Sequence, residues 1–232
     1  MDSARLSKLR RSTLTSDAYG VVRAMLLDNG RFQPGQKISV EMISRELGVS
    51  RSPVWSAIAR LDAEGLVEVS PRQGVYLVAF DKERLSDLFE TREALEGMAT
   101  RLAASRIAQA ELDALATQVK HQKALLSNLD EAEFSASSLD FHERILRGAR
   151  NSHIEQHLSV ICARISAMCR GRTSKYISKD LTAIYKDHCA ILKALRQRDE
   201  VASEALARAH VRWLKALALR NEVLPQRRQQ NA

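Results

Sequence analysis

The distribution of proline and glycine divides the chain into two regions of different character. Residues 81–221 contain no proline and few glycines, and their apolar residues recur at helical spacing. Because proline interrupts a helix and glycine weakens it, such a stretch is typical of successive amphipathic helices. Residues 17–80 instead mix short helical patterns with Gly and Pro and end in a β-like pattern. The sequence therefore predicts a mainly α protein of two domains that meet near residues 79–81.

Composition narrows the class of protein. Of the 232 residues, 45% are apolar and 28% are charged, which argues against a disordered, collagen-like or disulfide-stabilised chain. Lys and Arg number 36 against 28 for Asp and Glu, and the net charge of +8 favours polyanionic partners. No apolar run reaches the roughly 20 residues that span a bilayer, and no apolar core follows the basic N-terminus as in a signal peptide. Three cysteines without framework spacing favour reduced thiols, so we expect a cytoplasmic protein without a membrane partner.

The first region contains the order helix, helix, tight turn, helix, hairpin. The expected elements are a helix over 18–27, a strand at 37–38, helices after the capping residues Ser39 and Ser50, and strands over 66–70 and 75–80. Only Gly48-Val49-Ser50 separates the second helix from the third. This order predicts a winged helix-turn-helix, in which one helix enters the major groove of DNA and the hairpin touches the backbone.

The second region contains about six helices by its apolar periodicity. They are expected at 81–106, 109–127, 130–149, 151–172, 178–197 and 199–221. A basic arm over 1–16, with no apolar core behind it, and a polar tail over 222–232 complete the chain.

Several motifs carry a resemblance to a known family. They are Pro34-Gly35, the segments at 43–54 (ISRELGVSRSPV), 61–67 (LDAEGLV) and 71–74 (PRQG), then 88–96 (LFETREALE), Phe141-His142, Asn151, His188 and His210. In this order the first four resemble the GntR family of bacterial transcription regulators. The remainder resembles the FCD effector domain of its FadR-type branch. The resemblance implies a winged helix-turn-helix over 17–80 and an all-α effector-binding and dimerisation bundle over 81–221.

The resemblance also implies which residues contact DNA. Arg51, in the first turn of the third helix, could donate two parallel hydrogen bonds to a guanine, while neighbouring hydroxyls and the wing could bind phosphates. The expected DNA-binding residues are Ser50, Arg51, Ser52, Pro53, Trp55, Arg72 and Gly74. Arg72 and Gly74 could equally form a plain hairpin turn.

Trp55 departs from the family pattern, which usually has Arg at this position. Tryptophan cannot make the bidentate contact with guanine, but it can stack, pack against a thymine methyl group or lie on the DNA backbone. The alternative is that Trp55 packs against the first helix or the second domain.

Three histidines of the second region fall on largely apolar helix faces. His188 and His210 are central to such faces, and a buried imidazole needs a hydrogen-bond or metal partner. By resemblance, His142, His188 and His210 hold a divalent metal (zinc, nickel or manganese) together with an Asp one turn before the first. Ser138 occupies that position, and Asp140 points about 160° away from Ser138 on an ideal helix. The alternative is three hydrogen-bonded core histidines.

The remaining candidates concern an effector. Arg92 could anchor a carboxylate of a small organic acid, with Arg164 as a weaker candidate, although Arg92 could instead pair with Glu96 four residues later. A three-histidine metal with an open position also suggests a metal-dependent hydrolase or lyase. No general base is apparent near the motif, and the helix-turn-helix has no role in hydrolysis. We therefore expect a transcription regulator, and a repressor in particular, that binds a pseudo-palindromic double-stranded DNA operator as a homodimer.

Overall fold

The computed structural model describes residues 18–27, 31–128, 130–169 and 177–220. The predicted basic arm 1–16 and polar tail 222–232 lie outside these ranges. The chain divides into two compact units, one comprising residues 1–85 and 159–171 and the other residues 86–158 and 172–232. None of the described helices combines the length and apolar character needed to cross a membrane.

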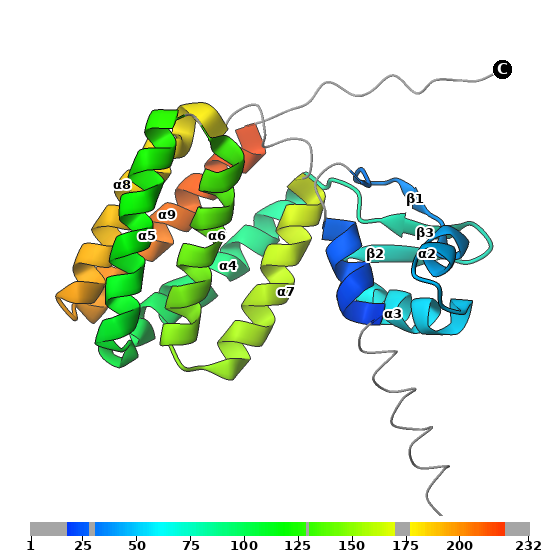
Figure 1. Ribbon diagram of the computed structural model, residues 1–232, viewed down its shortest axis with the longest axis horizontal. Helices are drawn as coiled ribbons and strands as arrows, with labels where there is room; N and C mark the ends of the chain where they lie inside the picture. The colour runs from blue at the N-terminus through cyan, green and yellow to red at the C-terminus, as the bar shows by residue number, and fades with distance from the viewer. Residues whose placement is uncertain (1–17, 28–30, 129, 170–176, 221–232) are drawn as a thin grey trace, which may run out of the picture. The chain divides into compact units, whose positions relative to one another are not determined.

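The first unit contains a helix over 18–27 followed by the predicted helix-turn-helix and wing. The further elements are β1 (Lys37–Ile38), α2 (Val40–Glu46), α3 (Arg51–Ala63), β2 (Val67–Ser70) and β3 (Gly74–Leu77) (Figure 1). The three strands form an antiparallel sheet in the order β1-β3-β2, with Ser70 opposite Gly74 at the wing turn. The returning strand ends at Leu77 rather than at the expected residue 80, and Asp81 then caps the next helix by accepting from the backbone N–H of Arg84 (2.9 Å).

The turn between α2 and α3 depends on one glycine. Gly48 has φ = +63°, a left-handed conformation that glycine adopts at little steric cost. The backbone N–H of Val49 then donates to the Ser44 carbonyl (3.0 Å), which closes the turn. Ser39 caps α2 as expected, since its hydroxyl accepts from the Met42 N–H (3.1 Å). Ser50 occupies the N-cap position of α3, but its hydroxyl makes no capping bond, contrary to expectation.

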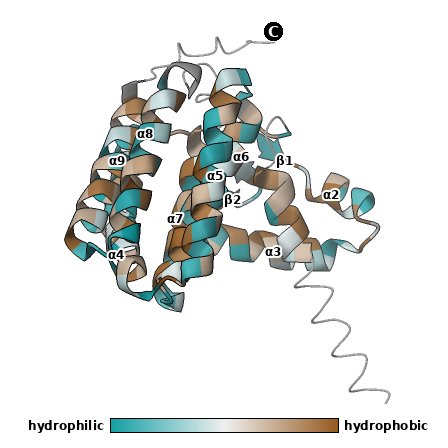
Figure 2. Cartoon of the chain, turned by 60° about the vertical axis from the view of Figure 1, so that its left-hand side comes forward, coloured by the Kyte–Doolittle hydropathy of each residue, from teal (hydrophilic) through white to brown (hydrophobic). Residues whose placement is uncertain are grey.

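The second unit is a helical bundle. Its helices are α4 (Lys82–Arg106), α5 (Gln109–Asn128), α6 (Glu131–Gly148), α7 (Ser152–Cys169), α8 (Ile177–Arg196) and α9 (Glu200–Arg220), with the start of α4 and the second half of α7 grouped in the first unit. The predicted helix bounds agree within one residue, except that the predicted end of α7 at 172 falls outside the described residues. Helices α5, α6, α8 and α9 pack side by side, and each mixes hydrophobic with hydrophilic positions (Figures 1 and 2).

Two apolar clusters form the core of this bundle. The larger joins α4, α5, α6 and α8 and includes the buried Phe141 and Leu195. The smaller contains Phe134 and Leu181, against which the half-buried Trp213 packs. The imidazole of His188 stacks on the ring of Phe141, with centroids 4.2 Å apart. The histidine thus lies inside the packed bundle, so its ring orientation is fixed by the core.

Candidate metal and DNA-binding sites

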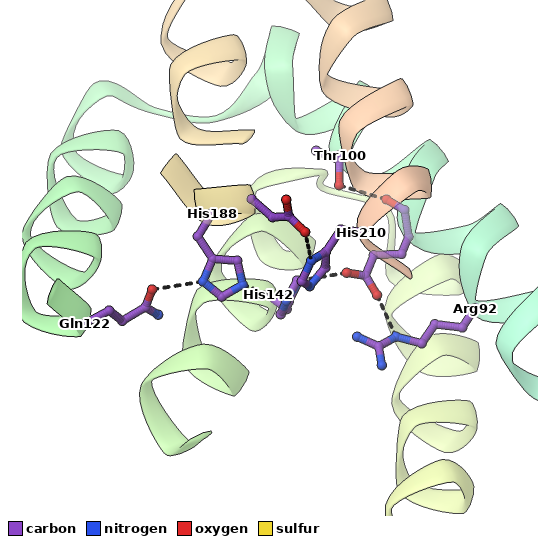
Figure 3. A network of polar contacts seen from close by, with 8 residues as sticks. Arg92, Thr100, Gln122, His142, His188 and His210 are labelled. Carbon is purple, nitrogen blue, oxygen red and sulfur yellow. Dashed lines mark hydrogen bonds and ion pairs between the residues drawn. The ribbon is translucent and has the colours of Figure 1, made fainter. Parts of the chain in front are cut away.

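The structure brings the three predicted histidines together in the second unit. His142 comes from α6, His188 from α8 and His210 from α9, and their ring centroids form a near-equilateral triangle with sides of 5.0, 5.2 and 5.3 Å (Figure 3). One ring nitrogen from each lies within 4.8 Å of the others. Three different helices, two of them consecutive in the sequence, therefore present imidazoles to one point.

Each imidazole faces a side-chain oxygen of another helix through Nδ1, as a hydrogen bond for His188 and His210 and as an ion pair for His142. The Nδ1 pairs are His142 with Glu96 Oε1 (2.7 Å), His188 with Gln122 Oε1 (2.9 Å) and His210 with Asp187 Oδ2 (2.9 Å). Because an ionised carboxylate or amide oxygen only accepts, Nδ1 carries the proton in each ring. The three Nε2 atoms are then left with lone pairs. Metal-binding histidines in proteins are oriented in this way by outer-shell acceptors.

The Nε2 atoms lie close together, in a geometry that fits metal ligands. Those of His142 and His188 face each other at 3.3 Å, and Nε2 of His210 is buried without a hydrogen-bond partner among the described residues. Two facing lone pairs repel, and an unpaired buried nitrogen is costly. Nitrogens bound to one tetrahedral zinc at about 2.0–2.1 Å lie about 3.3–3.4 Å apart, so the observed spacing fits a metal ligand pair. The donor set fits a divalent ion.

Burial and neighbouring charges shift the pKa values of three groups at the histidine site. Burial lowers the pKa of His188 well below its usual range, and the neighbouring histidines lower it further. Burial also lowers the pKa of His210, although Asp187 opposes this shift. For Glu96, burial favours the neutral acid, but Arg92 and His142 outweigh it and hold the pKa well below its usual range. The site therefore combines two imidazoles whose neutral form is favoured, those of His188 and His210, with the buried negative charge of Glu96.

The expected fourth ligand position remains a serine without charge. Ser138 is half-buried one turn before His142 on α6. Asp140 is occupied elsewhere, since its carboxylate accepts from Gln118 (2.7 Å) and Arg144 (2.9 Å). The nearby carboxylate is that of Glu96, which reaches His142 from α4 rather than from α6.

The two predicted effector arginines lie in different units. Arg92 donates through Nε to Glu96 Oε2 at 2.8 Å, so it forms the ion pair with Glu96 that the sequence predicts as the alternative to effector binding. Because Glu96 also contacts His142, Arg92 lies next to the histidine site. Arg164, on the part of α7 that belongs to the first unit, donates to the backbone carbonyl of Glu64. The structure thus groups Arg92, but not Arg164, with the three histidines.

The predicted DNA-binding residues line the start of α3 and the wing. Ser50, Arg51 and Ser52 are exposed, and Pro53 is half-exposed in the first turn, where proline is tolerated. The guanidinium of Arg51 lies 3.3 Å from the carboxylate of Glu41 on α2. Glu41 also holds Arg45 at 2.7 Å, so one acidic residue faces two cations on this surface.

The wing turn and Trp55 are also accessible. Arg72 is exposed with φ = +64°, and Gly74 has φ = +119°. The indole of Trp55 is 45% exposed, which disfavours packing inside the first unit as its role.

Three residues of the histidine site were not predicted from the sequence. Glu96, Gln122 and Asp187 each support one imidazole, and two of these contacts span distant segments. Only local hints of these supporting residues are present in the sequence. Glu96 follows Arg92 by one helical turn, and Asp187 is adjacent to His188.

Comparisons with known proteins agree with both halves of the chain. Residues 14–77 match the family model described as bacterial regulatory proteins, gntR family, and residues 87–212 match that of the FCD domain. The Nta operon transcriptional regulator of Aminobacter aminovorans is 29% identical over 76% of this chain and 82% of its own length. The transcriptional repressor GlaR of Escherichia coli is 27% identical over 86% of this chain and 93% of its own. The structure of E. coli McbR/YncC has the same fold, with a TM-score of 0.78 at 19% identity over 89% of this chain and 97% of that chain.

Proposed function

Because this chain belongs to the GntR family of bacterial regulatory proteins with an FCD domain, and is thus a DNA-binding transcription regulator and not an enzyme, we propose that it represses transcription under the control of a metal-dependent effector site. Residues 17–80 are the proposed DNA-binding domain, and residues 81–221 the proposed effector-binding and dimerisation domain. As a homodimer it would bind a pseudo-palindromic operator in the bacterial cytoplasm.

The arrangement that supports a metal is the inward convergence of three pinned imidazoles. His142, His188 and His210 would hold the ion through Nε2, with Nδ1 fixed by Glu96, Gln122 and Asp187. Imidazole nitrogens suit zinc and nickel, whereas manganese prefers oxygen ligands, so the absence of a carboxylate at Ser138 favours zinc or nickel. A bound divalent ion would supply positive charge and an open coordination position for a carboxylate ligand.

The proposed effector is a small organic acid. Arg92, Glu96 and His142 form a continuous chain of ionic contacts of 2.8 and 2.7 Å. An acid that takes Arg92 must compete with Glu96, and Glu96 in turn holds His142. Effector and metal would therefore influence each other's affinity by the same factor, as thermodynamic linkage requires.

Metal analysis of the full chain, purified without chelator or metal-affinity resin, tests this function. We expect near-stoichiometric zinc or nickel in the wild type and in His157→Gln, which replaces an exposed histidine of α7 that is not one of the three converging histidines. We expect its loss from His188→Ala. Absence of metal from the wild type after incubation with zinc, nickel and manganese salts would overturn the metal proposal. DNA binding by Arg51→Ala, measured in the same series, tests the proposed DNA-binding domain separately.

A further inference from the structure

The recognition surface of α3 has an unusual chemical character. Its buried side packs Val54, Ile58 and Leu61 into the first unit, so the opposite side is the one available to DNA. The exposed residues on that side are Arg51, Ser52, Trp55, Ser56, Ala59 and Asp62. The indole of Trp55 is therefore the one large apolar group among these residues, one turn after Arg51 and one turn before Ala59.

The two cations of α3 both face acidic residues, and Arg51 lies one turn before Trp55 on the same face, 3.3 Å from the Glu41 carboxylate. Arg51 lies at the first residue of the helix. Arg60 is drawn to the side, where it stacks on Tyr19 (3.7 Å from guanidinium carbon to ring centroid) and pairs with Glu64 (3.2 Å). The hydroxyl of Ser56 donates back to the Ser52 carbonyl (3.1 Å). The hydroxyl of Ser56, the residue next to Trp55, is thus already used within the helix, and Arg51 lies one turn before the indole.

We propose that Trp55 determines operator sequence by packing its indole against thymine methyl groups in the major groove. An indole has no acceptor and one N–H donor, so it cannot reproduce the two-bond contact of arginine with guanine. Its apolar body matches the one apolar group that a base pair presents in the major groove, the C5 methyl of thymine. Arg51 would then read guanine at the start of α3, and Trp55 would read A·T pairs further along. This inference rests on the proposed role of α3 as the recognition helix.

The test removes single methyl groups from the DNA. Duplexes are selected from a random-sequence library with the full-length wild type, and the affinity is measured for the best duplex and for versions with each thymine replaced by deoxyuridine. Deoxyuridine lacks only the methyl group. We expect one thymine position in each half-site to weaken wild-type binding about fourfold per methyl when replaced, the loss typical of one buried carbon.

Variants assign this effect to the indole. Trp55→Ala should bind the thymine and deoxyuridine duplexes equally, and Trp55→Phe should keep part of the discrimination. Met98→Ala, which removes an exposed apolar side chain of the second unit, is the matched control and should discriminate as the wild type does. Because Trp55 is exposed, its replacement should leave the fold intact, which circular dichroism checks.

Two results separate failure of this inference from failure of the proposed function. If Trp55→Ala selects the same sequence and keeps every deoxyuridine effect, or if no deoxyuridine replacement weakens the wild type, the thymine inference is wrong. If the wild type selects no sequence, or Arg51→Ala binds the selected duplex as tightly as the wild type, the role of α3 itself is wrong.

Discussion

The Nε2 atoms of His142 and His188 face each other at 3.3 Å inside the helical bundle. With both Nδ1 atoms protonated toward Glu96 and Gln122, this contact places two lone pairs together. A contact of this kind is unfavourable in the metal-free chain and becomes favourable once a cation lies between the nitrogens. Metal binding should therefore change the stability of the bundle as well as its ligand affinity.

Zinc should stabilise the wild-type chain. At a free zinc concentration 100 times the dissociation constant, the gain in free energy of unfolding is about 2.7 kcal/mol, which corresponds to a rise in Tm of about 5–10 °C. Differential scanning fluorimetry or calorimetry measures this rise. The His188→Ala and His142→Gln variants should show none, and His157→Gln should respond as the wild type does. An equal rise in all four proteins would mean that zinc binds elsewhere.

Replacing Glu96 by Gln should weaken metal binding without removing a ligand. The amide keeps the size of the side chain but removes the buried negative charge that fixes the Nδ1 proton of His142. Loss of such an outer-shell partner typically costs 10–100-fold in metal affinity. Competition with a chromophoric chelator gives the dissociation constants. Glu93→Gln, on the same helix with its carboxylate paired to Arg212 (3.6 Å), is the control and should bind metal normally. Unchanged affinity in Glu96→Gln would show that this carboxylate does not orient the ligand.

The metal-free protein should lose stability in mild acid. Burial lowers the folded-state pKa of His188 and His210, whereas both titrate near pH 6.5 in the unfolded chain. The unfolded chain therefore binds more protons below that pH. The contribution of these two histidines to the free energy of unfolding is fully present above about pH 6.5, and it is lost as the pH falls toward their folded-state pKa values. Between these pH values the free energy of unfolding falls by about 1.4 kcal/mol per pH unit for each histidine.

Urea denaturation in the presence of a chelator, between pH 5 and pH 8 (a window chosen about the ordinary histidine pKa), measures this dependence. His210→Asn should remove about half of the slope, and His153→Gln, an exposed residue at the start of α7, should leave it unchanged. A stability that stays constant across this pH range would contradict the assignment.

Two glycines of the first unit should respond oppositely to alanine. Gly48 has φ = +63°, so Gly48→Ala should lower the free energy of unfolding by about 1–2 kcal/mol. Gly20 lies exposed in the helix over 18–27 with open space around it, so Gly20→Ala should raise stability by about 0.5–1 kcal/mol. Chemical denaturation compares the two. Destabilisation by both substitutions would show that a factor other than backbone conformation controls these positions.

Glu41 should restrain DNA binding through its contact with Arg51. Arg51→Ala should weaken binding to a selected operator by about 1–3 kcal/mol, the range for a two-bond base contact. Glu41→Gln should strengthen binding to every duplex and steepen its salt dependence, because it removes a negative charge that lies 3.3 Å from Arg51. Fluorescence anisotropy of labelled duplexes at several salt concentrations measures both effects. Arg147→Ala on α6 should match the wild type, and weaker binding by Glu41→Gln would refute the restraint.

The sequence predicted what depends on local pattern. Apolar spacing placed the six helices of the bundle, and the glycine at 48 identified the tight turn before α3. The supports of the histidine site could not be found in this way. Contacts such as Glu96 with His142 and Gln122 with His188 join residues 46 and 66 positions apart, and they arise only when the core orients the helices. The exposure of Trp55 likewise depends on which face of α3 the first unit buries.

The chain carries two tryptophans, and the structure places one in each unit. Trp55 is exposed to water on α3, whereas Trp213 packs against the smaller apolar cluster and lies three residues after His210 on α9. Indole emission shifts to longer wavelength as its surroundings become more polar, so Trp55 contributes most at the red edge of the emission and Trp213 at the blue edge. A duplex that covers α3 should alter the red edge, and an ion at the histidines should alter the blue edge. The unlabelled protein can therefore report DNA and metal binding independently in a single fluorescence titration.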